Sequence, residues 1–138
     1  MHAAISANLN SIKYAMGKNR EAWLALYRDD AVVSDPVGVS PLDPVGNGHI
    51  GKQALADFFD NVISNANVTI IPGEHRISGD YSCAVPMQAI NDLGDGMTAT
   101  VDMIAVYHVD DQGLIKSMQA YWDWGALEQQ MAEIFSSL

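Results

Sequence analysis

The stretch AVVSDPVG, residues 31–38, decides the fold, because a β-branched run carries the carboxylate of Asp35 directly into a proline-closed turn. A residue before proline is pushed out of the α region, so Asp35 is expected to end a strand. Alternation then places Asp35 on the same face as Val33 and Ala31. If that face borders an apolar pocket, lost solvation raises the pKa of the carboxyl and makes it a useful base near neutral pH. An Asp-Pro pair also commonly starts a simple turn, and this reading stays open.

Length and charge limit the classes of protein to consider. The chain has 138 residues, about half of them apolar, which predicts a single domain over residues 1–138 with one continuous core. Seventeen acidic residues against seven basic ones give a net charge of −10, which argues against binding to nucleic acid or to anionic membranes. Cys83 is the single cysteine, so no internal disulfide is expected and a reducing, cytoplasmic location is predicted. The segment Met1–Met16 lacks an apolar block and predicts neither a secretion signal nor a membrane span.

Helical periodicity marks three segments in the first half of the chain. Ile5, Leu9, Ile12 and Met16 are spaced as one apolar stripe, which predicts a helix that ends near Gly17. Asn19 is placed to cap a second helix, which would stop before the strand that ends at Asp35. A third helix from about Gly51 is the clearest, because its apolar residues are spaced three and four apart. These residues are Leu55, Phe58, Phe59, Val62 and Ile63.

Strands are expected in the second half. Residues 68–71, 81–90, 97–109 and 114–124 are apolar segments separated by short turns rich in Gly, Pro and Asp. Such short connections predict an antiparallel meander, and helices followed by adjacent strands indicate an α+β domain with helices packed on a curved antiparallel sheet. Gly125 should end the last strand. The apolar residues between 127 and 135 predict a short terminal helix that could lie along a partner subunit.

Two segments carry a resemblance to a known family. The run LYRDDAVVSDPVG (26–38) and the run GLIKSMQAYW (113–122), with Phe58-Phe59 between them, resemble the Δ5-3-ketosteroid isomerases and related steroid isomerase-like proteins. These proteins belong to the nuclear transport factor 2-like superfamily, and the resemblance spans nearly the whole chain. It implies a cone-shaped, cystatin-like domain whose N-terminal helices pack on the concave face of the sheet. It also implies a deep apolar cavity, a homodimer and no cofactor.

The resemblance assigns the catalytic base. In that family the aspartate of the Asp-Pro-Val-Gly run moves a proton between carbons of a ketone, and Asp35 matches this position. The same four residues recur at Asp43, and the distance to the Phe58-Phe59 helix fits the family better when it is counted from Asp43. Asp35 is preferred because it follows a strand pattern, whereas Asp43 lies in a loop rich in Pro and Gly.

The family's two oxyanion donors are harder to match. Counting back from Asp35 places Ser11 where the family has a tyrosine, and Tyr14, one helical turn away, is the candidate substitute. Counting from the last run places Ala105 where the family has a protonated aspartate; Asp102 is three residues off, on the other side of the sheet. One lost oxyanion donor typically costs roughly 10²–10³ in rate. The resemblance therefore implies an isomerase with an incomplete oxyanion hole.

Apolar side chains on the third helix and the last two strands form the expected pocket wall. The substrate-binding candidates are Phe58, Phe59, Met103, Ala105, Met118 and Trp122. Large apolar walls suit a steroid-like or polyketide-like ligand, although ordinary core packing explains the same residue types. The histidines show no metal-ligand spacing, so no metal site is predicted.

Two alternatives to a steroid delta-isomerase remain open. Asp123 lies late in the last predicted strand, between two tryptophans, and resembles the late-strand carboxylate that acts in the polyketide cyclases of the same superfamily. A cyclase would therefore depend on Asp123 rather than on Asp35. The third possibility is a protein that binds a small apolar ligand without reacting with it.

Overall fold

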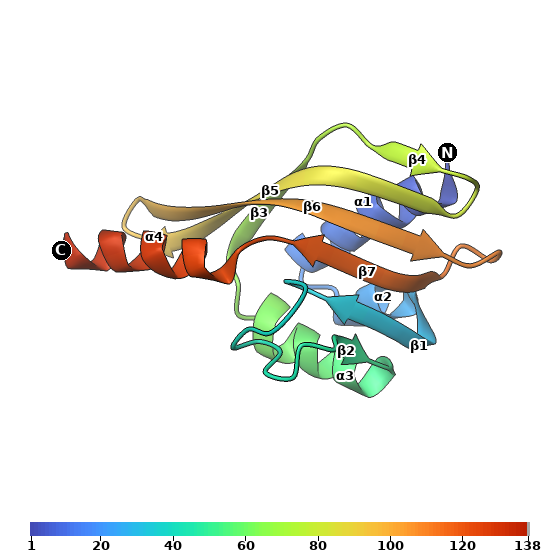
Figure 1. The fold of residues 1–138 in the computed structure, drawn as a ribbon, viewed down its shortest axis with the longest axis horizontal. Helices are drawn as coiled ribbons and strands as arrows, with labels where there is room; N and C mark the ends of the chain where they lie inside the picture. Colours follow the sequence, from blue (N-terminus) through green and yellow to red (C-terminus); the bar gives the residue numbers. More distant parts are fainter. Residues whose placement is uncertain (138) are drawn as a thin grey trace.

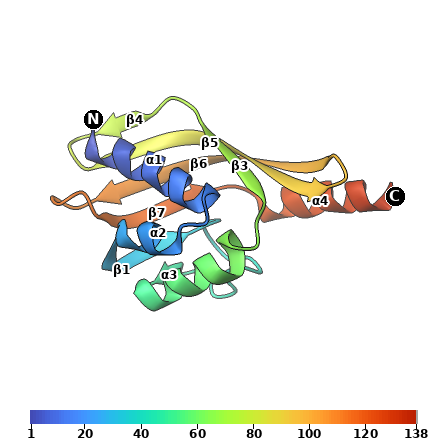
Figure 2. The ribbon, with the colours of Figure 1, turned by 180° about the vertical axis from the view of Figure 1, so that it is seen from behind.

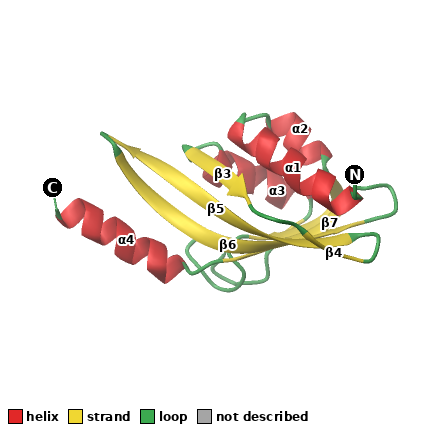
Figure 3. Cartoon of the chain, turned by 90° about the horizontal axis from the view of Figure 1, so that it is seen from above, coloured by secondary structure: helices red, strands yellow, loops and turns green. Residues whose placement is uncertain are grey.

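The computed structural model describes residues 1–137 and consists of a curved sheet with helices on its concave face (Figure 1). The helices are α1 (Ala3–Met16), α2 (Arg20–Ala25), α3 (Lys52–Phe58), which continues into a π-helical turn η1 (Phe59–Ile63), and α4 (Trp124–Ser136). The strands are β1 (Tyr27–Ser34), β2 (His49–Ile50), β3 (Val68–Pro72), β4 (Arg76–Ser78), β5 (Ser82–Gly94), β6 (Met97–Val109) and β7 (Ile115–Tyr121). Helices α1, α2 and α3 lie on one side of the sheet, whereas α4 extends along its far end (Figure 3). The α+β fold class predicted from the sequence is confirmed.

The sheet is mixed rather than wholly antiparallel, which corrects the predicted strand arrangement. Its strand order is β2-β1-β7-β6-β5-β3, with β4 also paired to β5. Strands β5, β6 and β7 form the predicted antiparallel meander, but β1 pairs with β7 in parallel. Hairpin turns join only antiparallel neighbours, whereas the long connection between β1 and β7 allows a parallel pair. This pairing brings the end of β1, and with it Asp35, beside the end of β7.

Helix α1 meets the sheet mainly through small and polar residues, and the apolar stripe predicted from the sequence contributes only partly buried contacts with the core. The stripe residues Ile5 and Ile12 are only partly buried, and Met16 is exposed. The buried residues are Ala4, Ala7, Asn8, Ser11 and Ala15. Small side chains at a contact allow a close approach of the packed elements. The view from behind shows α1 crossing β5 and β6 (Figure 2).

The alternation predicted for β6 is confirmed by burial. Val101, Ala105 and Tyr107 point into the core, while Asp102 is exposed and accepts a hydrogen bond from Gln88 on the outer face. Helix α2 is shorter than its apolar pattern suggested. Asn19 caps α2 as predicted, but Tyr27 already begins β1.

Helix α4 is hydrogen-bonded to the sheet through the side chain of Gln130. None of its described residues is buried. Strand β6 pairs with β7 only from Ile104 onward. The part of β6 before Ile104 therefore has β5 as its only neighbouring strand. There the side-chain amide of Gln130 accepts from the Thr100 N–H at 2.6 Å and donates to the Thr100 carbonyl at 2.9 Å. No helix within residues 1–137 is long and apolar enough to span a membrane.

Candidate active site

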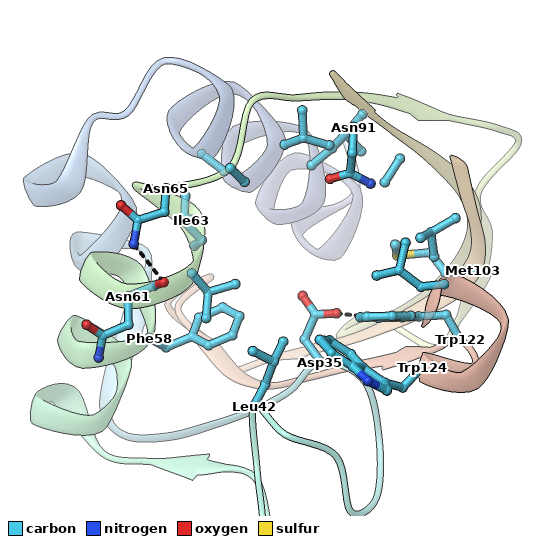
Figure 4. Close-up of a pocket in the computed structure, with 18 residues that line it drawn as sticks. Asp35, Leu42, Phe58, Asn61, Ile63, Asn65, Asn91, Met103, Trp122 and Trp124 are labelled. Atoms are coloured by element: carbon cyan, nitrogen blue, oxygen red, sulfur yellow. Dashed lines mark hydrogen bonds between the residues drawn. The ribbon is translucent and has the colours of Figure 1, made fainter. Parts of the chain in front are cut away.

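A cavity of about 390 Å³ lies between α3, η1, the inner face of the sheet and the start of α4, and Asp35 forms part of its wall (Figure 4). Most of its lining is apolar, including Phe58, Met103 and Leu127. The polar side chains other than Asp35 are Asn61, Asn65, Asn91 and the indole nitrogens of Trp122 and Trp124. The volume falls within the range of about 300–1,000 Å³ that is typical of small-molecule sites.

Local structure fixes the position of Asp35. The residue follows β1, and the turn after it is tied to β7 because the Val37 N–H donates to the Ala120 carbonyl at 3.0 Å. The Trp122 indole Nε1–H donates to Asp35 Oδ1 at 2.6 Å, as the dashed line in Figure 4 shows. No hydrogen bond among residues 1–137 involves Oδ2, so this oxygen is free to act on a ligand.

The environment makes Asp35 a stronger base than an ordinary aspartate. Burial raises the pKa of its carboxyl, while the hydrogen bond from Trp122 and the charge of His49 act in the opposite direction. Burial has the largest effect, because an ionised carboxylate loses its hydration in an apolar wall. The net result is a pKa above the usual value of 3.8. A base near a reacting carbon gains from such a shift, since proton transfer is most effective when its pKa approaches the working pH.

A second cavity of about 90 Å³ lies deeper in the same region. It shares Asp35, Phe58 and Met103 with the larger cavity, and its other lining residues include Ser11, Tyr107 and Met118. The larger space is the outer cavity and the smaller, deeper one is the inner cavity. Asp35 therefore borders both of them and can reach a ligand that extends from one into the other.

The residues predicted for the site are brought together only in part. Phe58, Met103, Met118 and Trp122 line one or both cavities. Phe59 and Ala105 are buried in the adjacent core and are not among the lining residues. Tyr14 packs, partly buried, against the core and likewise lines neither cavity.

The two aspartates that competed with Asp35 have clear structural roles. Asp43 is buried in the loop before β2, where its two carboxylate oxygens accept the Gly46 N–H at 3.0 Å and the Gly48 N–H at 2.8 Å. Asp123 is exposed and caps α4 by accepting the Gly125 N–H at 2.9 Å. Neither lines the cavities, whereas Asp35 lines both.

Sequence reasoning assigned no role to several residues that the fold brings to Asp35. Tyr107 was not among the predicted site residues, and Trp122 was assigned to ligand binding rather than to holding Asp35. His49 comes from the short strand β2, and its imidazole Nε2 is buried without a hydrogen-bond partner among the described residues. The alternation of β6 was the one available signal for Tyr107, because it places this hydroxyl on the same face as Met103.

Comparison with known proteins agrees with this geometry. The SnoaL-like domain family matches residues 14–118. The chain belongs to this family. As a SnoaL-like protein of the NTF2-like fold, it is similar to the Δ5-3-ketosteroid isomerase from Mycobacterium sp., at 34% identity over 91% of this chain and 97% of that chain, with a TM-score of 0.84. The resemblance to the ketosteroid isomerases stated from the sequence is confirmed.

Two further proteins with similar structures are described with steroids. RV0760c from Mycobacterium tuberculosis is 33% identical over 91% of this chain and 95% of that chain, with a TM-score of 0.86. A second structure of RV0760c contains estradiol-17beta-hemisuccinate. A computationally designed 17-OHP binder is 31% identical over 91% of this chain and 95% of that chain, with a TM-score of 0.83.

Proposed function

We propose that this SnoaL-like protein is a steroid delta-isomerase-like enzyme in which Asp35 is the general base. The observation that carries the proposal is the position of Asp35 in the wall of an apolar cavity. There its Oδ2 has no hydrogen-bond partner among the described residues, and its pKa is raised. The similarity to a ketosteroid isomerase and to steroid-binding proteins supports an apolar polycyclic ketone as the ligand. No cofactor is required for this chemistry.

The reaction is a proton transfer between two carbons of one molecule. Asp35 removes a proton from the carbon between the carbonyl and an isolated double bond. The C–H electron pair moves into the carbonyl system and gives a dienolate with its charge on oxygen. The carboxylic acid then returns the proton to the far carbon of the diene, the carbonyl is restored, and the double bond ends in conjugation with it. The Trp122 indole keeps Asp35 Oδ1 in place, so Oδ2 can serve both carbons.

Conversion of 5-androstene-3,17-dione to its conjugated isomer, followed by ultraviolet absorbance, tests the proposal. Asp35→Asn should lower kcat by about 10²–10⁴-fold, the usual contribution of a general base. Asp102→Asn is the matched control, because Asp102 is exposed on the outer face of the sheet and should leave the rate unchanged. Equal rates for Asp35→Asn and the wild-type protein would exclude Asp35 as the base.

A non-catalytic carrier of apolar ligands is the second candidate. It is favoured by Ala105, a methyl group at the position where the ketosteroid isomerases have an acidic oxyanion donor. A carrier would quench Trp122 fluorescence on binding steroid and give no product. A polyketide cyclase would instead lose turnover in Asp123→Asn. In an isomerase this change should have little effect, because asparagine can accept the Gly125 N–H and cap α4 as aspartate does.

The expected setting of the protein completes the proposal. We infer a cytoplasmic homodimer that acts on a small molecule. Cys83, the single cysteine in the sequence, is buried as a free thiol, which suits a reducing compartment. The net charge of −10 argues against nucleic acid as a partner.

A further inference from the structure

The dienolate formed by Asp35 needs a hydrogen-bond donor for its oxygen, and the inner cavity holds such a group. Of the described side chains that line the inner cavity, Ser11, Asp35 and Tyr107 carry oxygen, and the rest are mostly aliphatic or aromatic. A carbonyl entering this space would therefore meet one carboxylate and two hydroxyls. With a volume of about 90 Å³, the inner cavity can take the end of a ligand but not its whole body.

Tyr107 is held rigidly at this position. It lies near the end of β6, where this strand is paired on both sides, with Cys83 of β5 opposite Tyr107 on one side and Met118 of β7 on the other. Its side chain is 2% exposed. A donor fixed by two neighbouring strands does not have to reorganise when charge develops on the ligand, which is the condition for effective electrostatic stabilisation.

The proton of the Tyr107 hydroxyl is only weakly engaged. Its recorded partner is Ser11 Oγ at 3.4 Å, which is longer than the usual 2.5–3.0 Å of an O–H···O bond. A ligand oxygen that approaches more closely and carries more negative charge than Ser11 Oγ would replace it as the acceptor of this hydrogen bond. Burial raises the pKa of Tyr107 by more than the hydrogen bonds with Ser11 and Asn8 lower it, so the group remains a neutral donor at physiological pH.

We propose that Tyr107 donates a hydrogen bond to the carbonyl oxygen of the ligand in the inner cavity and stabilises the dienolate oxygen. The assignment of a catalytic role rests on the proposed isomerase function, whereas the hydrogen bond to a bound ketone does not. Tyr107 keeps its proton throughout, because the proton that moves between the carbons travels on Asp35. The donor thus comes from β6, although counting against the family placed the donors at Ser11 and Ala105.

Difference infrared spectroscopy of bound testosterone tests the hydrogen bond. Testosterone has one carbonyl, which is conjugated and does not react further in this isomerisation. In the wild-type protein its C=O stretching frequency should lie below the value in hexane, and Tyr107→Phe should move it back upward. Tyr121→Phe is the control, because it makes the same chemical change at an exposed position on the outer face. Tyr107→Met, which also lacks the hydroxyl, replaces the phenylalanine variant if that protein does not fold.

The possible outcomes separate the two proposals. A wild-type frequency equal to that in hexane, an unchanged frequency in both Tyr107 variants, or failure of testosterone to bind would overturn the role of Tyr107. If the wild-type protein isomerises its substrate, Tyr107→Phe should lower kcat by roughly 10²–10³-fold with a smaller change in KM. If no isomerisation occurs but the frequency shift is found, the isomerase proposal fails and Tyr107 stands as the ligand's hydrogen-bond donor.

Discussion

At the scale of single residues, Asp35 owes its reactivity to the balance between burial and one indole hydrogen bond. Burial raises its pKa, and Trp122 limits that rise. Both effects come from neighbours that are distant in the sequence. The end of a strand at this point was readable from the following proline, and β1 ends at Ser34, directly before Asp35. The Trp122 hydrogen bond, in contrast, depends on the parallel pairing of β1 with β7, for which the sequence contained no local signal.

The raised pKa of Asp35 predicts a specific pH dependence. A carboxyl whose folded pKa lies above its unfolded value favours the folded state at low pH, and this contribution is lost as the pH rises through the folded pKa. Asp35→Asn should therefore have a larger free energy of unfolding than the wild-type protein at neutral pH, and the difference should shrink as the pH falls toward 3.8. Urea unfolding at a series of pH values measures it. A wild-type protein that is the more stable of the two at neutral pH would contradict the prediction.

At the scale of elements, the helices show where periodicity succeeds and where it does not. The pattern of α3 predicted its buried face, because large apolar side chains there pack directly against the core. For α1 the same reasoning identified Ile5 and Ile12, which pack partly buried against the core, but it missed the small and polar residues that are buried most deeply, because the close contact with the sheet selects for size. The inner cavity depends on this choice, because Ser11 lies on the small-residue face.

The contact between Gln130 and Thr100 predicts how α4 is held. Gln130→Ala removes two hydrogen bonds that together contribute about 1–3 kcal/mol, so the amide protons of α4 should exchange roughly 10–100-fold faster in hydrogen-exchange mass spectrometry. Steroid binding should weaken as well, because Trp124 and Leu127 at the start of α4 line the outer cavity. Gln129→Ala is the matched control, since Gln129 is exposed and bonds only to Glu133 within the helix. Equal exchange in the two variants would show that α4 is held by other contacts.

At the scale of the whole molecule, the outer face of the sheet carries apolar side chains that the monomer leaves uncovered. Ile104 is 52% exposed and Tyr121 is 51% exposed. They are direct neighbours across β6 and β7, and Pro86 of β5 lies opposite Ile104 on the other side. The resemblance predicted a homodimer without indicating a surface. The pairing of these strands, which juxtaposes residues far apart in the sequence, indicates this face.

The apolar face predicts a dimer that responds to salt. Sedimentation analysis of the wild-type protein should give twice the chain mass of 14.9 kDa, and Ile104→Glu should shift the equilibrium to monomer. Val45→Glu, an exposed loop position, should not. Two chains with a net charge of −10 repel each other, and added salt screens this repulsion, so association should strengthen with ionic strength. A wild-type protein that remains monomeric at high salt would rule out this interface.

The side chain of Gln130 also bears on the solubility of the protein. Before Ile104, β6 pairs with β5 alone, so without α4 its other edge would expose unpaired backbone N–H and C=O groups. A strand from another molecule could pair with these groups. The side-chain amide of Gln130 occupies both backbone groups of Thr100, as a residue of a neighbouring strand would, and so prevents pairing at this position. Loss of the helix by proteolysis would therefore do more than open the cavity: it would leave a template for edge-to-edge stacking, and the shortened chain should precipitate where the whole protein stays in solution.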